Sequence, residues 1–354
     1  MPAEYEVVVV GGGPGGLTTA LYTTRLGHET ALINREGGRY TTVEHVHNVI
    51  GISEETTGRE ITALALDQLE EYGADCHADT VQNVARTRDG GQFRVEAHDR
   101  TVLAERVVLA TGFKDAPPSF PELTRYTGHG LHYCLHCDAY SLIDEPVYVF
   151  GHTESAAEMA MMMLNFTADV ELLLHGAEPE WDEGTDDQLR AHPVGVREEE
   201  AVTVHPRDSE AGRPEIGAIE FADGTIREYV GGFAKYGTSY NNRLAKGLGC
   251  ELDDEGAVQV DDEGRTSVEG VYAVGDLTHG QNQTPIAMGD GARAGLALHH
   301  ELRTFPVPSE EIEAGETPSE FDVPAVSEAI REKAHDVQKR DDHAGMTSSN
   351  PNER

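Results

Sequence analysis

The feature that most constrains the fold is a glycine-rich turn directly after an apolar run near the N-terminus. Residues 5–10 read YEVVVV, and GGGPGG follows at 11–16 before LTTALYTTRLG, whose apolar residues have helical spacing. Gly11, Gly13 and Gly16 fit the pattern GxGxxG in the strand-turn-helix context that it requires. The first glycine allows a tight turn, the second lets a pyrophosphate approach, and the third lets helix and strand pack closely. The segment predicts a dinucleotide-binding unit, although a tight turn that binds nothing would read the same.

Further apolar runs of strand length predict the rest of the fold class. They are HETALINRE at 28–36, RVVLATG at 106–112, VYVFG at 147–151 and GVYAVGD at 270–276. The first of these ends in the cluster Asn34, Arg35 and Glu36, where a dinucleotide-binding unit has its acidic residue, about 20 residues past the glycines. Strands that alternate with helices predict an α/β fold with parallel sheets. Glycine turns after two of the strands indicate two nucleotide-binding-like units.

The charge balance excludes several classes of partner. The chain has 64 acidic against 27 basic residues, a net charge of −37. Lysine occurs only at Lys114, Lys235, Lys246, Lys333 and Lys339. Such an anion is a poor partner for nucleic acid or for an anionic membrane. Because the acids are spread over both halves of the chain, self-repulsion would weaken the folded state in dilute salt, so we expect a halophilic protein.

The N-terminus and the apolar content favour a cytoplasmic protein. The opening MPAEYEVVVV is acidic rather than basic and runs straight into a strand. The longest apolar stretch, around AAEMAMMMLNF, is far shorter than the roughly 20 residues that a membrane span requires. With 354 residues and a hydrophobic content of 38%, the chain can fill the cores of about two domains.

The sequence YCLHCDAY at 133–140 carries the clearest chemistry. Cys134 and Cys137 are two residues apart, and the other cysteines, Cys76 and Cys250, are single. A zinc site would need a second ligand pair, although three histidines in HGLHYCLHCD keep a metal as an alternative. A static disulfide is disfavoured in a reducing cytosol. A redox dithiol fits best, because cysteines at this spacing close a small ring and a nearby histidine can lower the pKa of a thiol.

A second acidic turn follows the last predicted strand. In VYAVGDLTHGQNQTPIAMGDGARAG, Asp276 comes directly after a strand and a glycine, and a helix begins near Ala287. An aspartate at this place can accept hydrogen bonds from a ribityl chain, and helix N-terminal amides can face a pyrimidine carbonyl.

At this point the chain resembles the low-molecular-weight thioredoxin reductases and their flavoprotein relatives. The resemblance covers residues 5 to about 303 and rests on VVVVGGGPGG, GGRYTTVEHVHNVIG, VVLATG, CLHCD, and VYAVGD with QTPIAMGDG, in the order and spacing of that family. It implies two Rossmann-like, three-layer ββα domains and a homodimer. The FAD-binding domain would be discontinuous, at 1–115 and 238–304, and an NAD(P)-binding-like domain with the CxxC would span 116–237.

The resemblance also implies the residues of a FAD site. FAD would lie across the first glycine turn, with Asp276 on the ribityl chain, Gln283 near the flavin ring, and Thr42 and Asn48 lining the isoalloxazine. The implied cofactor-binding residues are Gly11, Gly13, Pro14, Gly16, Glu36, Gly38, Thr42, Asn48, Thr111, Gly112, Gly275, Asp276, Gln283, Thr284 and Ala287. The sequence departs from the family at Arg39, where glutamine is usual, and at Asn282, where arginine is usual.

The same resemblance assigns roles to the CxxCD residues. Cys137 would face the flavin, Cys134 would exchange with the substrate disulfide, and Asp138 would handle protons, since a leaving thiolate must be protonated on each turnover. His136 stands where the family commonly has a small or hydroxylated residue. It either tunes the cysteine pair or is an exposed histidine without consequence.

The second glycine turn departs from the family. It reads FGHTESAAE, in which only Gly151 remains and His152 and Thr153 replace glycines. After the next strand, His175 and acidic residues stand where arginines would grip the 2′-phosphate of NADPH. The sequence therefore predicts that affinity for NADPH is weak or lost.

This departure leaves three functional hypotheses. The first is a reductase acting on a thioredoxin-like protein or a small disulfide, with electrons from poorly bound NADH, a ferredoxin or a reduced deazaflavin. The second is a dithiol oxidase that uses FAD and oxygen without a nicotinamide. The third is a flavin redox sensor without turnover, which is weakest because a CxxCD beside a flavin is hard to explain without catalysis.

Residues 305–354 have a different composition, rich in proline, glutamate and serine. We expect an acidic, largely disordered extension. A short amphipathic segment, in which Val326, Ile330 and Val337 share a face, leaves a docking helix as the alternative.

Overall fold

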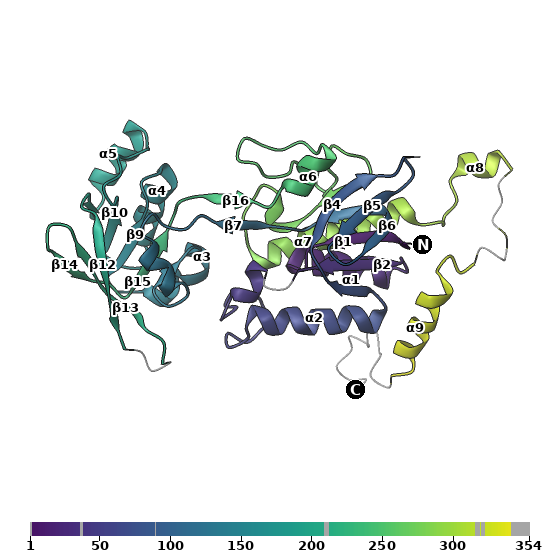
Figure 1. Cartoon of the computed structure of the whole chain (residues 1–354), viewed down its shortest axis with the longest axis horizontal. Helices are drawn as coiled ribbons and strands as arrows, with labels where there is room; N and C mark the ends of the chain where they lie inside the picture. The colour runs from purple at the N-terminus through teal and green to yellow at the C-terminus, as the bar shows by residue number, and fades with distance from the viewer. Residues whose placement is uncertain are drawn as a thin grey trace, which may run out of the picture. The chain divides into compact units, whose positions relative to one another are not determined.

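The computed structural model describes residues 2–35, 38–88, 90–208, 212–315, 319 and 323–340 (Figure 1). Glu36, one of the implied cofactor residues, lies outside them. The chain forms two compact units. Unit 1 comprises residues 1–113 and 240–354, and unit 2 comprises residues 114–239. The chain passes between them in β7 (Phe113–Asp115) and β16 (Thr238–Tyr240), which pair with each other.

Unit 1 is built on a mainly parallel sheet with strand order β3-β2-β1-β6-β5-β4, in which β17 also pairs with β6. The strands are β1 (Ala3–Val10), β2 (Thr30–Asn34), β3 (Asp75–Ala78), β4 (Val81–Arg86), β5 (Phe93–Ala97), β6 (Thr101–Leu109) and β17 (Val271–Ala273). The strands β3, β2, β1, β6 and β17 run parallel, whereas β4 and β5 are antiparallel additions. The run VVVV is buried on both faces, as expected for a central parallel strand.

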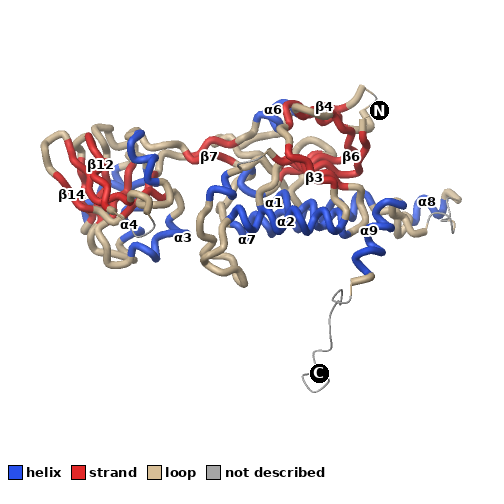
Figure 2. Tube along the Cα trace, turned by 60° about the horizontal axis from the view of Figure 1, so that its bottom comes forward, coloured by secondary structure: helices blue, strands red, loops and turns tan. Residues whose placement is uncertain are grey.

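Three helices of unit 1 lie along one face of this sheet (Figure 2). They are α1 (Pro14–Arg25), α2 (Gly58–Tyr72) and α7 (Thr284–Leu302), while α6 (Arg243–Leu248) lies near β4. Thr57 and Glu60 form a capping box that starts α2. Close packing of α1 on α7 needs glycine, because a Cβ at Gly291 would lie 2.2 Å from the Gly15 carbonyl oxygen. This contact brings the N-terminal ends of α1 and α7 together.

Unit 2 contains a parallel sheet of order β11-β10-β9-β15-β8 and an antiparallel sheet of order β12-β13-β14. Its strands are β8 (Leu131–His132), β9 (Val147–Phe150), β10 (Val170–Leu173), β11 (Val194–Arg197), β12 (Ala201–Arg207), β13 (Glu215–Phe221), β14 (Ile226–Glu228) and β15 (Gly231–Ala234). Its helices are α3 (Leu135–Asp138), α4 (Glu154–Met163) and α5 (Glu183–Ala191). The prediction of an α/β fold with two Rossmann-like parallel sheets is confirmed.

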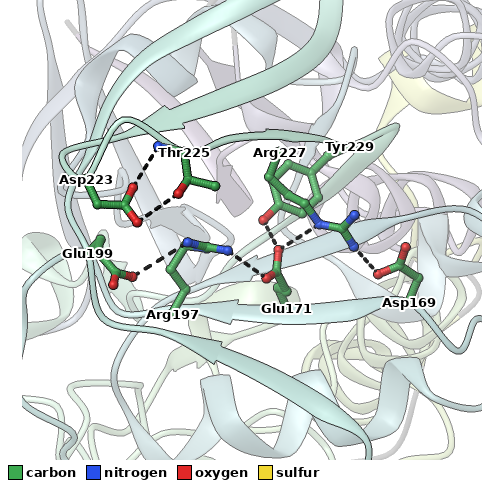
Figure 3. Close-up of polar contacts among 8 residues, drawn as sticks. All are labelled: Asp169, Glu171, Arg197, Glu199, Asp223, Thr225, Arg227 and Tyr229. Carbon is green, nitrogen blue, oxygen red and sulfur yellow. Dashed lines mark hydrogen bonds and ion pairs between the residues drawn. The ribbon is translucent and has the colours of Figure 1, made fainter.

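Figure 3 shows the polar network that joins the two sheets of unit 2. Glu171 on β10 accepts a hydrogen bond from Arg197 Nη2 at 3.3 Å and another from Arg227 Nε at 3.2 Å. The Tyr229 hydroxyl also donates to this carboxylate. Because Glu171 is largely buried, these donors compensate a charge that would otherwise be costly to bury.

In the described part of the C-terminal segment lie the helices α8 (Ser309–Glu313) and α9 (Glu328–Gln338). Ile330 and Val337 of α9 are buried, and α9 packs against α2. Lys333 Nζ donates to the Gly73 carbonyl at 3.0 Å, and Arg340 Nη1 lies 2.7 Å from Glu71 Oε2. The amphipathic segment is thus a helix that packs on α2, which is the alternative left open by the sequence, because apolar residues that share one helix face find a partner there. The expected disorder of the rest of the extension stays a prediction.

Candidate functional site

The first glycine turn forms an open cradle in unit 1. Gly11 has a φ of +111°, and Gly13 precedes α1 without a side-chain cap, so the first amides of α1 face outward. A Cβ at Gly13 would meet no atom within 4 Å, whereas one at Gly16 would lie 2.0 Å from the Gly11 carbonyl oxygen. Asn34 Oδ1 accepts a hydrogen bond from the Gly12 N–H at 2.9 Å. The turn therefore has the shape and the donors of an anion site.

Three further segments of unit 1 meet at this cradle. A Cβ on Gly15 would lie 3.1 Å from the Ala287 carbonyl oxygen and 3.4 Å from Gly275 Cα. Gly112 has a φ of +61°, and a Cβ there would lie 3.8 Å from Asp276 Cβ. Segments that are far apart in the sequence thus surround the glycine cradle, which lies at the carboxyl ends of β1, β6 and β17.

Arg39 contacts the carboxylate of Asp276 beside the cradle. Its Nη1 lies 3.9 Å from Asp276 Oδ2, and its guanidinium lies over the Phe113 ring at 4.6 Å from the centroid. Nearby, Asn48 Nδ2 donates to Gln283 Oε1 at 2.5 Å, across 235 residues of sequence. The family resemblance implies that Asn48 and Gln283 both lie near a flavin ring, and the structure brings these two side chains into contact.

A small cavity adjoins Asp276. It has a volume of about 230 Å³, and its lining includes Gly275, Asp276, Ala287, Asp290 and Arg293. Burial raises the pKa of Asp290, and Arg293, at 3.9 Å, opposes the rise. Thr42, in the short helix Arg39–Thr42, donates its hydroxyl to the Arg39 carbonyl instead of lining this cavity.

The cysteine pair lies in unit 2. Cys134 and Cys137 form a disulfide with a Cα–Cα distance of 5.3 Å. Cys134 precedes α3, and its carbonyl accepts the backbone N–H groups of Cys137 and Asp138 at 3.2 Å. Asp138 Oδ2 lies 3.3 Å from His132 Nδ1, and both side chains are mostly buried. His136 is exposed. The segment combines an oxidised dithiol with a carboxyl group, which is a minimal arrangement for thiol/disulfide exchange with proton transfer.

The second glycine turn, also in unit 2, is crossed by the chain that follows β10. The Glu180 N–H donates to the His152 carbonyl at 2.7 Å, and Glu180 forms a parallel bridge with Thr153. Glu154, the first residue of α4, accepts a hydrogen bond from the Asp182 N–H at 3.2 Å. The N-terminal end of α4 is therefore lined by carboxylates and covered by a chain segment.

His175 occupies the place where the resemblance implies a phosphate-binding cation. Its ring lies 5.6 Å from the Phe120 ring and 5.5 Å from the Phe150 ring, and its Nδ1 accepts the Ala201 N–H at 3.0 Å. Burial lowers the pKa of His175, so a neutral imidazole is favoured.

Comparison with known proteins connects these features. A family model described as pyridine nucleotide-disulphide oxidoreductase matches residues 5–291. The chain belongs to this family. Because the chain belongs to a family of oxidoreductases, the prediction that it is an enzyme is confirmed. The predicted resemblance is confirmed at the level of the family.

Individual relatives of this oxidoreductase are distant. It is 30% identical over 316 residues to an alkyl hydroperoxide reductase component of Pseudomonas putida, covering 85% of this chain and 59% of that protein. The chain thus spans about three fifths of the length of the first curated relatives that it matches. A thioredoxin reductase of Peptoclostridium litorale is 28% identical, with 84% and 96% covered.

Solved structures agree with the fold of this oxidoreductase. The thioredoxin reductase from Streptococcus pyogenes superimposes with a TM-score of 0.78 at 26% identity, covering 86% of this chain and all of that one. In the described ranges, no helix of the oxidoreductase is long and apolar enough to cross a membrane. The same ranges hold no group of three or more histidine, cysteine, aspartate or glutamate side chains suited to a metal ion.

The structure places the implied cofactor residues of the oxidoreductase in unit 1 and the cysteine pair in unit 2. The implied residues lie in the β1–α1 turn (Gly11, Gly13, Pro14, Gly16), in or beside the helix at 39–42 (Gly38, Thr42), in the next loop (Asn48), after β6 (Thr111, Gly112), after β17 (Gly275, Asp276) and at the start of α7 (Gln283, Thr284, Ala287). Their roles stay predictions.

Sequence reasoning missed a second cavity in unit 1. It has a volume of about 320 Å³ and is lined by Arg35, Ala78, Asp79, Thr80, Gln82 and His98. The Asp79 side chain is 2% exposed and accepts backbone N–H groups from Thr80 at 2.6 Å and from His98 at 3.1 Å. The only signal was a polar pair, Asp-Thr, at the carboxyl end of a strand beside β2.

Proposed function

We propose that the chain is a FAD-dependent dithiol/disulfide oxidoreductase. Electrons pass between flavin, the Cys134/Cys137 pair and the disulfide of a thioredoxin-like protein or a small dithiol. The observation that carries this proposal is the Cys134–Cys137 disulfide followed directly by Asp138, in a chain of the pyridine nucleotide-disulphide oxidoreductase family. The name of the Peptoclostridium litorale relative, thioredoxin reductase, supports the choice of partner.

The residues of unit 1 fit FAD. The open Gly13 position and the uncapped amides of α1 suit a pyrophosphate. The Asp276 carboxylate suits ribityl hydroxyls, and the amides of Asn48 and Gln283 suit the polar edge of a flavin ring. FAD supplies two-electron redox chemistry when it is bound. The FAD-binding domain then comprises residues 1–115 and 238–304, and residues 116–237 carry the dithiol.

The chain's own residues supply thiol/disulfide exchange and proton transfer. A substrate thiolate attacks Cys134, the Cys134–Cys137 bond breaks, and Cys137 leaves as a thiolate with the electron pair of that bond. Asp138 gives a proton to the thiolate in this direction and takes one in the reverse direction. Attack by the second substrate thiol on the mixed disulfide then releases Cys134, so the substrate loses two electrons and two protons, and the cysteine pair gains them.

Unit 2 is poorly suited to bind the nicotinamide cofactor that a standard reductase cycle requires. Glu154 and Glu180 place carboxylates at the N-terminal end of α4, where a pyrophosphate would need donors and positive potential. His175 offers a neutral ring against aromatic side chains. These features support weak or lost binding of NADPH and NADH, and a ferredoxin or a deazaflavin as donor.

The same features favour a second candidate, a dithiol oxidase. In that case electrons enter through Cys134 and Cys137 and leave to oxygen, and unit 2 needs no nucleotide. The remaining parts of the proposal, a homodimer, a cytoplasmic location and a high-salt cytosol, apply to both candidates. The net charge of −37 supports the last.

Anaerobic spectroscopy of the purified protein in molar KCl separates these candidates. NADPH, NADH or a small dithiol is mixed with the protein, and the flavin absorbance is followed. Rapid bleaching by a nicotinamide would establish a nicotinamide-driven reductase and refute the weak-binding proposal. Bleaching by dithiols alone, followed by recovery with oxygen, supports the oxidase. A protein that purifies without flavin and binds no added FAD would refute the flavoenzyme proposal.

A further inference from the structure

We propose that His132 is a positioning residue for Asp138, so that the proton chemistry of the dithiol uses a histidine-carboxylate pair. This inference rests on the proposed dithiol/disulfide function. His132 Nδ1 lies 3.3 Å from Asp138 Oδ2. The side chains are 15% and 25% exposed, so bulk water screens their contact only in part.

The fold holds the imidazole against a buried aromatic ring. β8 and β15 pair in parallel, and in this register His132 is the partner of Phe233. The His132 ring lies 5.8 Å from the Phe233 ring, and Phe233 is fully buried. Because the histidine belongs to a strand and packs on the core, its ring is a fixed support for a carboxyl group that follows a short helix.

The local structure around Asp138 fixes its backbone but does not orient its carboxyl group. It ends α3, a helix of only four residues, and its backbone N–H is used by the Cys134 carbonyl. The Ser141 hydroxyl donates to the Asp138 carbonyl oxygen at 2.7 Å, which fixes the backbone but not the carboxyl group. Contact with His132 orients one carboxyl oxygen and leaves the other to exchange a proton with sulfur.

The contact between His132 and Asp138 should affect how readily the cysteine pair forms a thiolate, which can be measured. A carboxylate near a cysteine disfavours the thiolate, and an imidazole N–H directed at the carboxylate offsets part of that negative potential. Other titratable side chains on adjoining elements are His136 on α3, Tyr133 before Cys134, and Tyr140 in the helix Ala139–Leu142. From β15 the packing partner is Phe233, which carries no charge.

The test is the rate of alkylation of the reduced pair by iodoacetamide as a function of pH, in the full-length protein after reduction with dithiothreitol. His132→Phe keeps a ring against Phe233 but removes the donor. We expect it to raise the midpoint of the alkylation profile by about half a pH unit or more. In an Asp138→Asn background, His132→Phe should have no effect, because the carboxylate through which His132 acts is gone.

Two further variants make the test specific. His132→Asn retains a donor near the Nδ1 position and should restore most of the wild-type profile. His129→Asn is the matched control, because that ring contacts Arg213 Nη1 at 3.1 Å; it should behave as wild type.

The outcomes separate this inference from the function on which it rests. An unchanged midpoint in His132→Phe, or the same shift in both backgrounds, would overturn the positioning role. If His132→Phe does not fold, an unchanged profile in His132→Gln, which removes a donor from the Nδ1 position, would overturn it equally. A wild-type Cys134–Cys137 pair that dithiothreitol cannot reduce would instead refute the proposed dithiol function.

Discussion

The backbone N–H of Glu180 donates to the carbonyl oxygen of His152 at 2.7 Å, and this bond carries the chain across the N-terminal end of α4. In a nucleotide-binding unit the same end faces the pyrophosphate. The Glu180 carboxylate also lies 3.7 Å from His152 Nε2. On our proposal, this crossing closes the second Rossmann-like unit of the chain where a nucleotide would need an open turn.

Removal of this carboxylate tests whether charge contributes to weak nucleotide binding. We expect Glu180→Gln to tighten NADPH binding about threefold to tenfold, because one anionic group near the phosphates is gone. Calorimetric titration at the lowest KCl concentration that keeps the protein folded would measure it. Glu178→Gln, on the same exposed loop, is the control. Tight binding to the wild-type protein would contradict the premise.

The dithiol assignment predicts graded losses of activity. Cys134→Ser and Cys137→Ser should abolish turnover of a disulfide or dithiol substrate, because no exchange can occur without both sulfurs. Asp138→Asn should slow turnover by roughly 10², the usual weight of general acid-base catalysis. Steady-state rates of the purified variants would show this, with Cys76→Ser as the control. An Asp138→Asn rate equal to wild type would remove the proposed proton role.

The first glycine turn should not tolerate a side chain at Gly16. A Cβ there would lie 2.0 Å from the Gly11 carbonyl oxygen, so Gly16→Val must displace the turn. We expect purified Gly16→Val to contain less than about a tenth of the flavin per protein, measured by absorbance. Gly247→Ala, in α6 with open space around its Cβ position, controls for added bulk. Full flavin content in Gly16→Val would place the cofactor elsewhere.

Some features of the candidate site could be predicted from the sequence, and others depend on tertiary contacts. The glycine turn and the cysteine pair were readable because each depends on a short, local pattern of residue types. The contact between His132 and Asp138 was not readable, since it depends on how β8 turns into α3. The Asp79 cavity was missed for a similar reason, because it joins strand ends that no motif marks. The docking of α9 depends on Gly73, which lies 260 residues from Lys333.

Asp79 gives unit 1 a defined response to acid. Burial alone would raise the pKa of its carboxyl group, but the backbone N–H groups of Asp99, Thr80 and His98, with Arg100, lower the pKa below its ordinary value. A carboxyl group with a lowered folded pKa stabilises the protein above its unfolded pKa, about 3.9, and this stability is lost as pH falls through the folded pKa.

We therefore expect Asp79→Asn to be less stable than wild type near neutral pH, with the difference shrinking below about pH 4. Melting temperatures between about pH 7 and pH 3 would measure this. Asp99→Asn, an exposed neighbour, is the control. A difference that is constant across this range would show that the charge of Asp79 is irrelevant.

The acid excess predicts a strong dependence of stability on salt. With a net charge of −37, self-repulsion should lower the melting temperature in dilute buffer, and screening should raise it steeply toward molar KCl. Thermal scans in KCl would test this against an uncharged osmolyte at matched osmolality, which cannot screen charge. Equal rises in both, or a melting temperature indifferent to KCl, would contradict the expectation.

The position of α9 has a consequence for solubility. β3 stands at one end of the strand order of the unit 1 sheet, and an edge strand offers unpaired backbone groups to other molecules. Lys333 of α9 contacts the Gly73 carbonyl just before β3 and lies 3.9 Å from Asp75, its first residue. The C-terminal helix thus shields the start of an edge at which two copies could otherwise join strand to strand, and loss of α9 would first appear as self-association.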